Sequence, residues 1–266
     1  MTPDQITRAA EALDAARHSG QQTGLISLAN PGMTLADAYT IQDAFVAARM
    51  ATGLTRIGWK IGLTSRAMQQ ALNITTPDSG VLLSDMAFDS GATVAAGRFI
   101  QPRVEAEIAF VMGCDLSGAD ATRADVVAAT DQVAPALEIL DTRIMRADPT
   151  TGKPRSIFDT VADNAANAGV VLGTARHHLN DHDLRWVGAI VKRDGVVEET
   201  GLGAGVMDDP VTGVLWLVHR LAEFGGGLRA GEVVLSGSFI RPLEAPGDSS
   251  FLADFGDFGS VEISFA

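Results

Sequence analysis

The sequence contains very little cysteine: Cys114 is the only one among 266 residues. A single thiol excludes an internal disulfide and a metal cluster built on several thiolates, and it favours a reducing compartment. Long apolar runs are missing as well, since no stretch approaches the roughly 20 residues of a membrane helix. Residues 1–7 lack the basic and then apolar plan of a signal peptide. We therefore expect a cytoplasmic protein that is not bound to a membrane.

Positive charge is scarce, because 20 Lys and Arg residues stand against 33 Asp and Glu, a net charge of −13 at pH 7. Nucleic-acid binding requires clusters of Lys and Arg that neutralise phosphates, and no such cluster is apparent. We therefore expect no nucleic-acid partner. A small anionic ligand is not excluded, since one arginine or a metal ion can reverse the local field in a pocket.

The hydrophobic pattern divides the chain into two parts. Apolar residues recur at helical spacing over 6–16 and 35–48, and residues 64–72 also read as a helix. Beyond residue 80 the pattern changes to strands, clearest at 103–112, 134–140, 168–172, 233–240 and 260–265, with Asp194-Gly195 as a strong hairpin signal. We predict an α+β fold, with a small helical N-terminal lobe at 1–75 and a mostly antiparallel β domain at 76–266.

Three glutamates interrupt apolar runs. Glu105 and Glu107 lie within 102–110, and Glu138 lies within 133–140. Side chains at i and i+2 of a strand share a face, so Glu105 and Glu107 should project together. Buried like charges cost several kcal/mol each unless compensated, and three carboxylates without histidine or cysteine suit Mg²⁺ or Mn²⁺ better than zinc. Spacing alone leaves a solvated sheet face as an equal alternative.

Lys60 lies between the apolar residues Trp59 and Ile61. A buried lysine can have a pKa lowered toward neutrality and can then act as an acid–base group. On this residue alone, the favoured interpretation is a stem that crosses apolar surface while the ammonium reaches water. Asp78, within 77–80, has first of all the composition of a turn.

Two further polar segments are candidates for binding a ligand. Asp163, Asn164 and Asn167 lie among small residues, which could line a pocket; the alternative is a helix cap that begins at Asp163. Ser238 follows an apolar strand, where its hydroxyl and nearby N–H groups could hold a carboxylate. A nucleophilic serine is not supported, since the sequence has no Gly-x-Ser-x-Gly elbow.

Taken together and in this order, the segments resemble the hydratase/decarboxylase branch of the fumarylacetoacetate hydrolase superfamily. The likeness covers essentially the whole chain and is carried by residues 60–65, 77–80, 102–110, 135–141, 158–169, 198–201 and 236–242. Residues 148–160, which include Lys153-Pro-Arg155, bring the sequence nearest to members that hydrate the seven-carbon 2-oxohept-4-ene-1,7-dioate. Members that hydrate the five-carbon 2-hydroxypenta-2,4-dienoate share most of the other motifs.

The resemblance implies a β-roll fold of that superfamily, and a catalytic role for the β-rich part. It implies a divalent cation, Mg²⁺ or Mn²⁺, on Glu105, Glu107 and Glu138. It also implies a small-molecule 2-oxo acid substrate and a ring-like homo-oligomer. Lys60 is then the expected proton shuttle, and Asp78 its partner or the group that orients water.

The same resemblance directs attention to substrate contacts. Asn164 and Ser238 are candidates for holding substrate oxygens. An arginine is expected for the second carboxylate of a dicarboxylic substrate, and Arg143 and Arg155 are both candidates between which the sequence does not choose.

Three other functions compete with hydration. A decarboxylase would use the same metal site, but the Asn-Ala-Ala-Asn-Ala run at 164–168 favours a hydratase. A C–C hydrolase of the wider superfamily would need a His–Glu pair on a lid, and His18 is the only histidine before Lys60. A non-catalytic structural subunit of a hydratase–decarboxylase complex is disfavoured by the intact set of Lys60, Asp78 and three glutamates.

Overall fold

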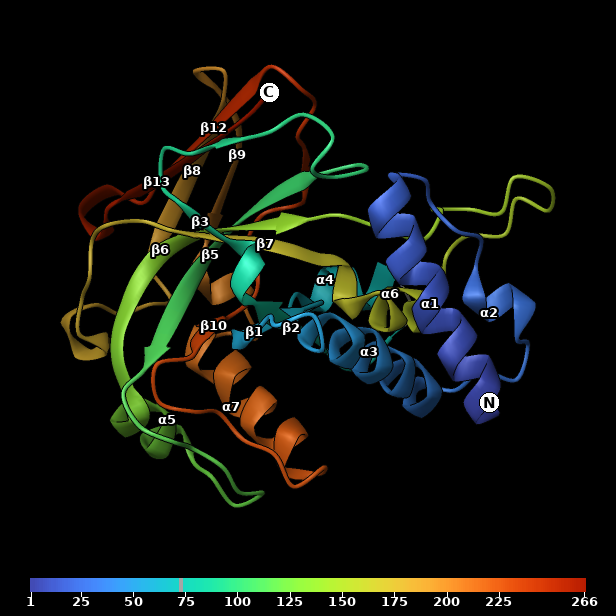
Figure 1. Cartoon of the computed structure of the whole chain (residues 1–266). Coiled ribbons are helices and arrows are strands. Elements are labelled where there is room, and N and C mark those ends of the chain that lie inside the picture. The colour runs from blue at the N-terminus through green and yellow to red at the C-terminus, as the bar shows by residue number, and fades with distance from the viewer. Residues whose placement is uncertain (72–73) are drawn as a thin grey trace.

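Over residues 1–71 and 74–266, which the computed structural model describes, the protein has two β-sheets, a group of N-terminal helices and further helices later in the chain (Figure 1). In Figure 1 the N-terminal helices lie at the right of the sheets, and the last strands of the chain lie at the upper left, within the smaller sheet. Within these residues, no helix is long and apolar enough to cross a membrane.

In the described part of the chain, the larger sheet has eight strands in the order β2–β1–β10–β5–β6–β7–β3, with β11 pairing with β5. Its strands are β1 (Arg56–Gly62), β2 (Asp78–Leu83), β3 (Ala87–Asp89), β5 (Arg103–Met112), β6 (Thr130–Leu140), β7 (Asn167–Leu172), β10 (Val233–Leu235) and β11 (Leu243–Glu244). β1 runs parallel to β10 and β3 runs parallel to β7, while the other neighbours are antiparallel.

The smaller sheet, counted over the same residues, has five strands in the order β4–β13–β12–β8–β9. They are β4 (Thr93–Val94), β8 (Gly188–Arg193), β9 (Val196–Leu202), β12 (Ser249–Asp254) and β13 (Ser260–Phe265). Asp194 and Gly195 join β8 to β9 with φ of 51° and 81°, the left-handed pair that a tight hairpin turn requires. The fold is therefore mixed and mostly antiparallel, as predicted.

The helices begin and end where the sequence provides caps. They are α1 (Pro3–Ser19), α2 (Ile26–Ala29), α3 (Leu35–Met50), α4 (Arg66–Ala71), α5 (Arg123–Ala129), α6 (Ile157–Ala162) and α7 (Pro210–Ala222), with 3₁₀ turns η1 (Ser84–Met86), η2 (Asn164–Ala166), η3 (Leu179–Asp181), η4 (Gly203–Gly205) and η5 (Gly256–Phe258). Thr34 and Asp37 form a reciprocal capping box at the start of α3. Gly20 ends α1 in the left-handed conformation that glycine adopts without strain. Of the helix predicted over 64–72, residue 72 lies outside the described residues.

Two hydrophobic clusters hold these elements together. The larger cluster lies between the sheets and α7, and includes Ile108 and Leu137 of the two central strands. The smaller cluster joins α1, α2 and α3 to α6 through residues such as Leu13, Phe45 and Val161. The N-terminal helices therefore pack on α6 from the middle of the chain.

The packing does not follow the predicted division at residue 75. β1 was placed in the helical lobe, yet it lies in the larger sheet between β2 and β10. α6 was placed in the β domain, yet it belongs to the helical cluster. The division into two domains stays a prediction. Within the described residues, β1 packs with the β part and α6 packs with the helical part.

The strand predicted over 233–240 ends early, at Leu235. Gly237 has a φ of 116°, which turns the chain away from the sheet. Its N–H donates to Glu107 Oε2 at 2.7 Å. The departure of this segment from the sheet therefore places a backbone donor at the central glutamates.

Candidate active site

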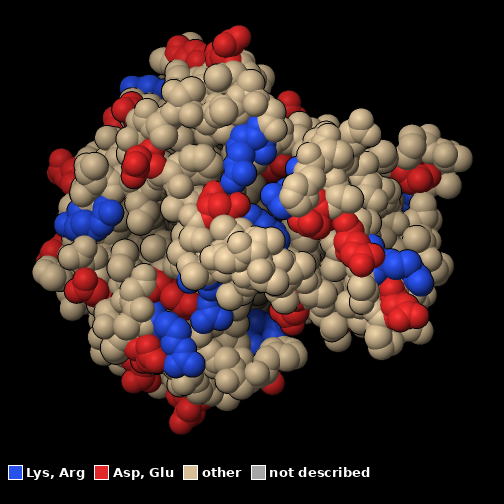
Figure 2. All heavy atoms as spheres, viewed as in Figure 1, with Lys and Arg blue, Asp and Glu red and all other residues tan. Residues whose placement is uncertain are grey.

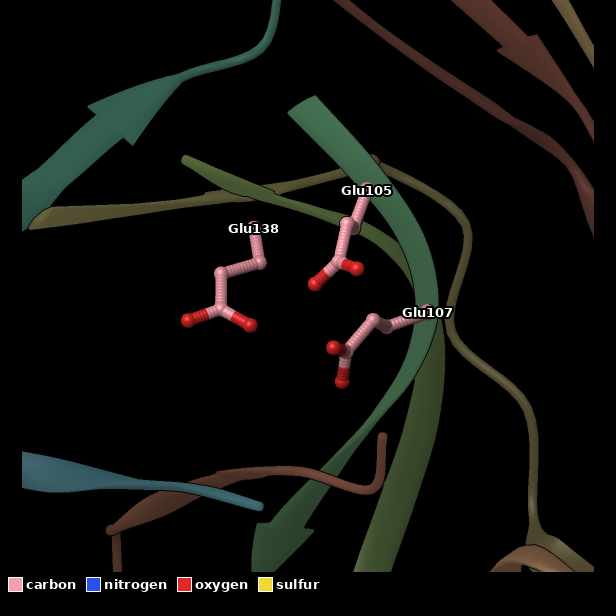
Figure 3. Close-up of side chains that lie close together, drawn as sticks. All are labelled: Glu105, Glu107 and Glu138. Carbon is pink, nitrogen blue, oxygen red and sulfur yellow. The ribbon is translucent and has the colours of Figure 1, made fainter. Parts of the chain in front are cut away.

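Glu105, Glu107 and Glu138 lie together at the centre of the larger sheet. Glu105 and Glu107 share one face of β5, and Glu138 on β6 lies opposite Glu105 in the strand register. Figure 3 shows the three carboxylates turned toward one another. One carboxylate oxygen from each residue lies within 4.8 Å of the others.

These carboxylates have few hydrogen-bond donors. Among the described residues, Glu107 Oε1 and both oxygens of Glu138 are buried without a hydrogen-bond partner. Lys60 Nζ lies 3.4 Å from Glu138 Oε1, which is an ion-pair distance without hydrogen-bond geometry. Buried polar atoms are nearly always satisfied, so these oxygens indicate that a further group binds here. A donor set of three carboxylates fits a hard divalent cation such as Mg²⁺ or Mn²⁺.

Burial and mutual repulsion shift the acid–base equilibria of the glutamates. Burial raises the pKa of Glu105 to about 8, and the charge of Glu138 adds to the shift. Burial likewise raises the pKa of Glu107 well above its ordinary value, and it raises the pKa of Glu138. The charged forms of these side chains are therefore poorly stabilised by the protein alone.

Lys60 and Asp78 lie side by side above Gly62. In the register of β1 and β2, Asp78 is opposite Gly62. A Cβ at Gly62 would lie 2.9 Å from Lys60 Nζ and closer still to Asp78 Oδ1, so only glycine leaves room for both groups. Both side chains are buried, and Asp78 Oδ1 has no hydrogen-bond partner among the described residues. Burial raises the pKa of Asp78, against the opposing effects of Lys60 and the N–H of Gly62.

The pKa of Lys60 moves in the direction opposite to that expected from its apolar neighbours. Burial lowers it, but the carboxylates of Glu138 and Asp78, and then of Glu105 and Glu107, outweigh burial and raise the pKa. Sequence neighbours could not reveal four carboxylates brought in from other strands. The ammonium form is therefore the resting form in this setting.

Two predicted substrate-binding residues have partners within the protein. Asn164 Oδ1 accepts from Val81 N at 2.8 Å, and its Nδ2 donates to Val81 O at 2.9 Å. Arg143 is buried, and its Nε donates to Asp163 Oδ1 at 2.5 Å. Its terminal nitrogens donate to the carbonyls of Asp163 and Asn167. Asp163 follows the last residue of α6 and precedes the 3₁₀ turn η2, where its side chain makes no capping hydrogen bond.

The turn that follows Asp163 is left-handed over three residues. Asn164, Ala165 and Ala166 have φ of 52°, 53° and 59°, a region that costs non-glycine residues about 1–3 kcal/mol each. The two hydrogen bonds from Asn164 to Val81 hold this turn against β2. As a result, Ala165 and Ala166 form part of the cavity wall.

A cavity of about 430 Å³ opens above the glutamates. Lys60, Asp78 and Glu105 form part of its lining, while Asn164 and Arg143 do not. Ser238 also lines it, and its Oγ donates to Ile240 O at 2.9 Å. Two of the predicted residues, Asn164 and Arg143, therefore support the cavity without lining it. The other predicted residues lie in or beneath the cavity: Lys60, Asp78, Glu105, Glu107, Glu138 and Ser238.

Four arginines line this cavity: Arg103, Arg146, Arg155 and Arg241. Arg241 pairs with Glu199, whereas Arg103 and Arg146 reach Glu244 at 3.5 and 3.6 Å. No described carboxylate lies within ion-pair distance of Arg155, whose Nη1 donates to Ile144 O at 3.4 Å. Burial lowers the pKa of Arg155. Two arginines were predicted to bind a distal carboxylate. Arg155 lines the cavity without an ion pair among the described residues, whereas Arg143 does not line it.

Sequence reasoning missed Arg103, Arg146, Arg241 and Glu199 as cavity residues. Arg103 and Arg241 lie within the segments 102–110 and 236–242, so their place beside motif residues was an unused signal. Arg146 lies in the long connection after β6, where no pattern marks it. The position of such a loop residue depends on the three-dimensional path of the chain, so the sequence pattern does not predict it.

The residues that line this cavity in the described chain include no histidine. His177 and His182 lie elsewhere, with ring centroids 4.6 and 5.3 Å from that of Phe258. The base required by the C–C hydrolase hypothesis is therefore missing from the described lining.

Comparison with known proteins adds relatives that match along the whole chain. "2-Oxo-hept-4-ene-1,7-dioate hydratase" of Escherichia coli is 46% identical over 259 residues, 97% of each chain. "2-Keto-4-pentenoate hydratase" of Paraburkholderia xenovorans is 40% identical over 100% of this chain and 96% of that one. The structure of "4-oxalocrotonate decarboxylase from Pseudomonas putida G7", complexed with magnesium and adipate, superposes with a TM-score of 0.93 at 30% identity, covering 100% and 99% of the two chains. No family model matches the chain.

Proposed function

Because the chain belongs to the hydratase branch of the fumarylacetoacetate hydrolase superfamily, we propose that it is a divalent-metal-dependent hydro-lyase acting on 2-oxohept-4-ene-1,7-dioate. Addition of water gives 4-hydroxy-2-oxoheptane-1,7-dioate, a step in meta-cleavage catabolism of aromatic compounds. The observation that carries the proposal is the cavity itself, which is lined by Glu105 of the three-glutamate cluster, by Lys60 and Asp78, and by Arg155, an arginine without an ion pair among the described residues.

The cation would be held by Glu105, Glu107 and Glu138. Mg²⁺ is our first choice and Mn²⁺ our second, because the donor set consists of carboxylate oxygens. The decarboxylase of Pseudomonas putida G7, 30% identical, was solved with magnesium and a dicarboxylate. When bound, the cation supplies a Lewis acid for the 2-oxo acid group and offsets part of the negative charge that faces Lys60.

The reaction requires proton movement along the carbon chain. The dienol form loses its 2-hydroxyl proton and gains a proton at C5, which leaves a double bond between C3 and C4 conjugated to the ketone. Water then adds its oxygen at C4, and C3 gains a proton, so that the net change is one water. The protein therefore needs one group that donates a proton and one that accepts it.

Lys60 and Asp78 supply these two groups in our proposal. Lys60 Nζ carries a proton in its resting form, because the surrounding carboxylates raise its pKa. Asp78 Oδ1 is buried without a hydrogen-bond partner among the described residues and can accept a proton from water. The two groups do not contact each other directly, since Lys60 pairs with Glu138, but both lie within 2.9 Å of a Cβ built at Gly62, so a single water between them can relay a proton.

Arg155 is proposed to bind the distal carboxylate of the seven-carbon substrate. Arg155 lines the same cavity as Glu105, and its guanidinium has no ion pair with any described carboxylate. A guanidinium fork matches the two oxygens of a carboxylate. Ser238 remains the proposed hydroxyl contact for a substrate oxygen, whereas Asn164 is proposed to act through the turn that it anchors.

The five-carbon 2-hydroxypenta-2,4-dienoate is the second candidate substrate, because a hydratase of that class is 40% identical. That substrate has one carboxylate and would leave Arg155 without a partner. Decarboxylation is less supported, since the decarboxylase relative is 30% identical against 46% for the hydratase. A non-catalytic subunit would have no use for the clustered Lys60, Asp78 and glutamates.

We also propose that the chain forms a ring-like homo-oligomer. Large apolar side chains are exposed on and beside the β8–β9 hairpin, namely Trp186, Ile190, Val196, Val197 and Leu202. Apolar clusters of this kind are typical of protein interfaces. Light scattering coupled to size exclusion would test this proposal, and a monomer at micromolar concentration would contradict it.

The function is tested by turnover of enzymatically generated 2-hydroxyhepta-2,4-diene-1,7-dioate in the presence of Mg²⁺. We expect loss of dienol absorbance and a product heavier by one water, with both abolished by a chelator and restored by Mg²⁺. Loss of CO₂ would instead identify a decarboxylase. Turnover of the five-carbon dienol alone would keep the chemistry and change the substrate.

A further inference from the structure

A second cavity of about 610 Å³ adjoins the active-site cavity. The two cavities share Gln101, Arg103 and Arg146, so these residues form the wall between them. The second cavity is bounded on one side by β11 of the larger sheet, and on the other by the end of β8 and by the C-terminal Phe265 and Ala266. We call this second cavity the vestibule.

The vestibule is lined by positive charge in a protein whose net charge is −13. Arg103, Arg146 and Arg193 line it, and Glu244 is the acidic residue among its described lining. Arg193 also pairs with Glu198 at 2.6 Å. Figure 2 shows several Lys and Arg side chains along the middle of the visible face, interspersed with Asp and Glu. A local excess of positive charge attracts anions and raises their rate of association.

Glu244 is loosely held between two of these arginines. Its Oε1 lies 3.5 Å from Arg103 Nη2 and 3.6 Å from Arg146 Nη2, and its side chain is 76% exposed. Exposed ion pairs of such length contribute little to stability, because solvent screens them. The ion pair between Arg143 and Asp163, at 2.5 Å, is by contrast almost completely buried. A carboxylate arriving from solution can therefore replace Glu244 at low cost.

We propose that the vestibule admits the dianionic substrate, and that a substrate carboxylate displaces Glu244 from Arg103 and Arg146 on its way to the inner cavity. Both arginines face both cavities, so they can pass the anion inward toward Arg155. The identity of the dianion rests on the proposed function, but the charge argument applies to any small dicarboxylate. A dicarboxylate interacts with the field through two charges, so the vestibule favours it over a monocarboxylate.

The first test is Glu244→Gln, which removes the competing charge while keeping the size of an exposed side chain. In the Mg²⁺-loaded protein, calorimetry should show adipate binding about threefold more tightly, and hexanoate changing less. With the seven-carbon dienol, kcat/KM should rise by a similar factor through KM, with little change in kcat. At about 1 M salt, where the Debye length is about 3 Å, the gain should disappear.

The second test is Arg193→Gln, at a residue of the vestibule that does not line the inner cavity. Adipate binding should weaken about threefold. Arg185→Gln is the matched control, because it makes the same change in net charge at an exposed arginine, paired with Asp183, that lines neither cavity. The control should bind adipate as the parent does.

The vestibule proposal is overturned if Glu244→Gln binds adipate no better than the parent, or if Arg193→Gln matches Arg185→Gln. Because adipate binding needs no turnover, this outcome is separate from the fate of the proposed function. Tighter adipate binding by Glu244→Gln without turnover of either dienol would keep the vestibule and refute the hydratase assignment. Turnover of the dienol, with adipate binding unchanged by Glu244→Gln, would support the hydratase assignment and refute the vestibule proposal.

Discussion

Among the buried charged groups of the described residues, the Arg143 cluster and the glutamate cluster differ in how well their atoms are bonded. In the Arg143 cluster, the guanidinium donates to the Asp163 carboxylate and to carbonyls of Asp163 and Asn167. In the glutamate cluster, Glu107 Oε1 and both oxygens of Glu138 have no hydrogen-bond partner among the described residues. Glu107 and Glu138 are as buried as Arg143 and Asp163, so exposure does not distinguish these residues.

The difference indicates which cluster supports the fold and which performs chemistry. A buried ion pair with complete hydrogen bonding is stable without a ligand, and removing one partner strands the other. Buried carboxylates without donors destabilise the protein by itself, and they persist where a ligand compensates them. Neutralising one carboxylate in each cluster should therefore have opposite consequences for stability and for activity.

Glu107→Gln should have the largest effect of the changes considered. Loss of a proposed metal ligand would cost about 4 kcal/mol of transition-state stabilisation, or roughly 10³-fold in kcat/KM. The free energy of unfolding in chelator should stay the same or increase, because an unpartnered buried charge is removed. Steady-state turnover and urea denaturation would measure the two quantities. Full activity together with lost stability would reverse the roles that we assign to the clusters.

Asp163→Asn is the matched change in the other cluster, since it also replaces a carboxylate with an amide of the same shape. It leaves the Arg143 charge buried without a counter-ion, so the free energy of unfolding should fall by about 3 kcal/mol. The folded fraction should retain its kcat, because neither residue lines the cavity. Denaturation and turnover at low temperature, where the variant stays folded, would separate the effects. A tenfold loss of kcat in folded protein would argue that this cluster belongs to the active site.

The sequence singled out residues of both clusters, but it predicted only the glutamates as a cluster and did not predict that Arg143 pairs with Asp163. Each cluster appears as polar residues within apolar or small-residue runs, and strand periodicity was sufficient to place Glu105 beside Glu107. Asn164 and Arg143 were predicted to bind the substrate. Their actual partners, the backbone of Val81 and the Asp163 carboxylate, are brought to them by tertiary packing, which the sequence does not show. The position of β1 within the larger sheet was likewise hidden, because its partner β10 lies more than 170 residues away.

Arg155→Gln tests whether Arg155 binds the substrate. Unlike Arg143, Arg155 has no ion pair with a described carboxylate. Loss of a charged hydrogen bond to the distal carboxylate would cost about 2 kcal/mol, or about 30-fold in kcat/KM for the seven-carbon dienol. The five-carbon dienol should be turned over as before, and stability should change little. Arg155→Lys should recover part of the loss, because it keeps the charge without the fork. Equal losses for both substrates would place Arg155 in the framework with Arg143.

The smallest expected effect is a pH dependence of stability that belongs to the glutamate cluster alone. Burial raises the pKa of Glu105 from an ordinary 4.5 to about 8, so the folded protein binds more protons than the unfolded chain between these values. The contribution of Glu105 to stability is therefore fully present below pH 4.5 and is lost as pH rises through about 8.

In chelator, Glu105→Gln should therefore become more stable than the parent as pH rises from 6 to 8. Allowing for partial exposure of Glu105, the gain should be about 1 kcal/mol. Asp163→Asn is the comparison, since its deficit in the free energy of unfolding should not turn into a gain over this range. Mg²⁺ should stabilise the parent more at pH 8 than at pH 6, because ligand carboxylates must lose their protons to bind it. A difference between Glu105→Gln and the parent that does not change with pH would mean that Glu105 is already compensated by the protein, which would remove the contrast between the two clusters at that residue.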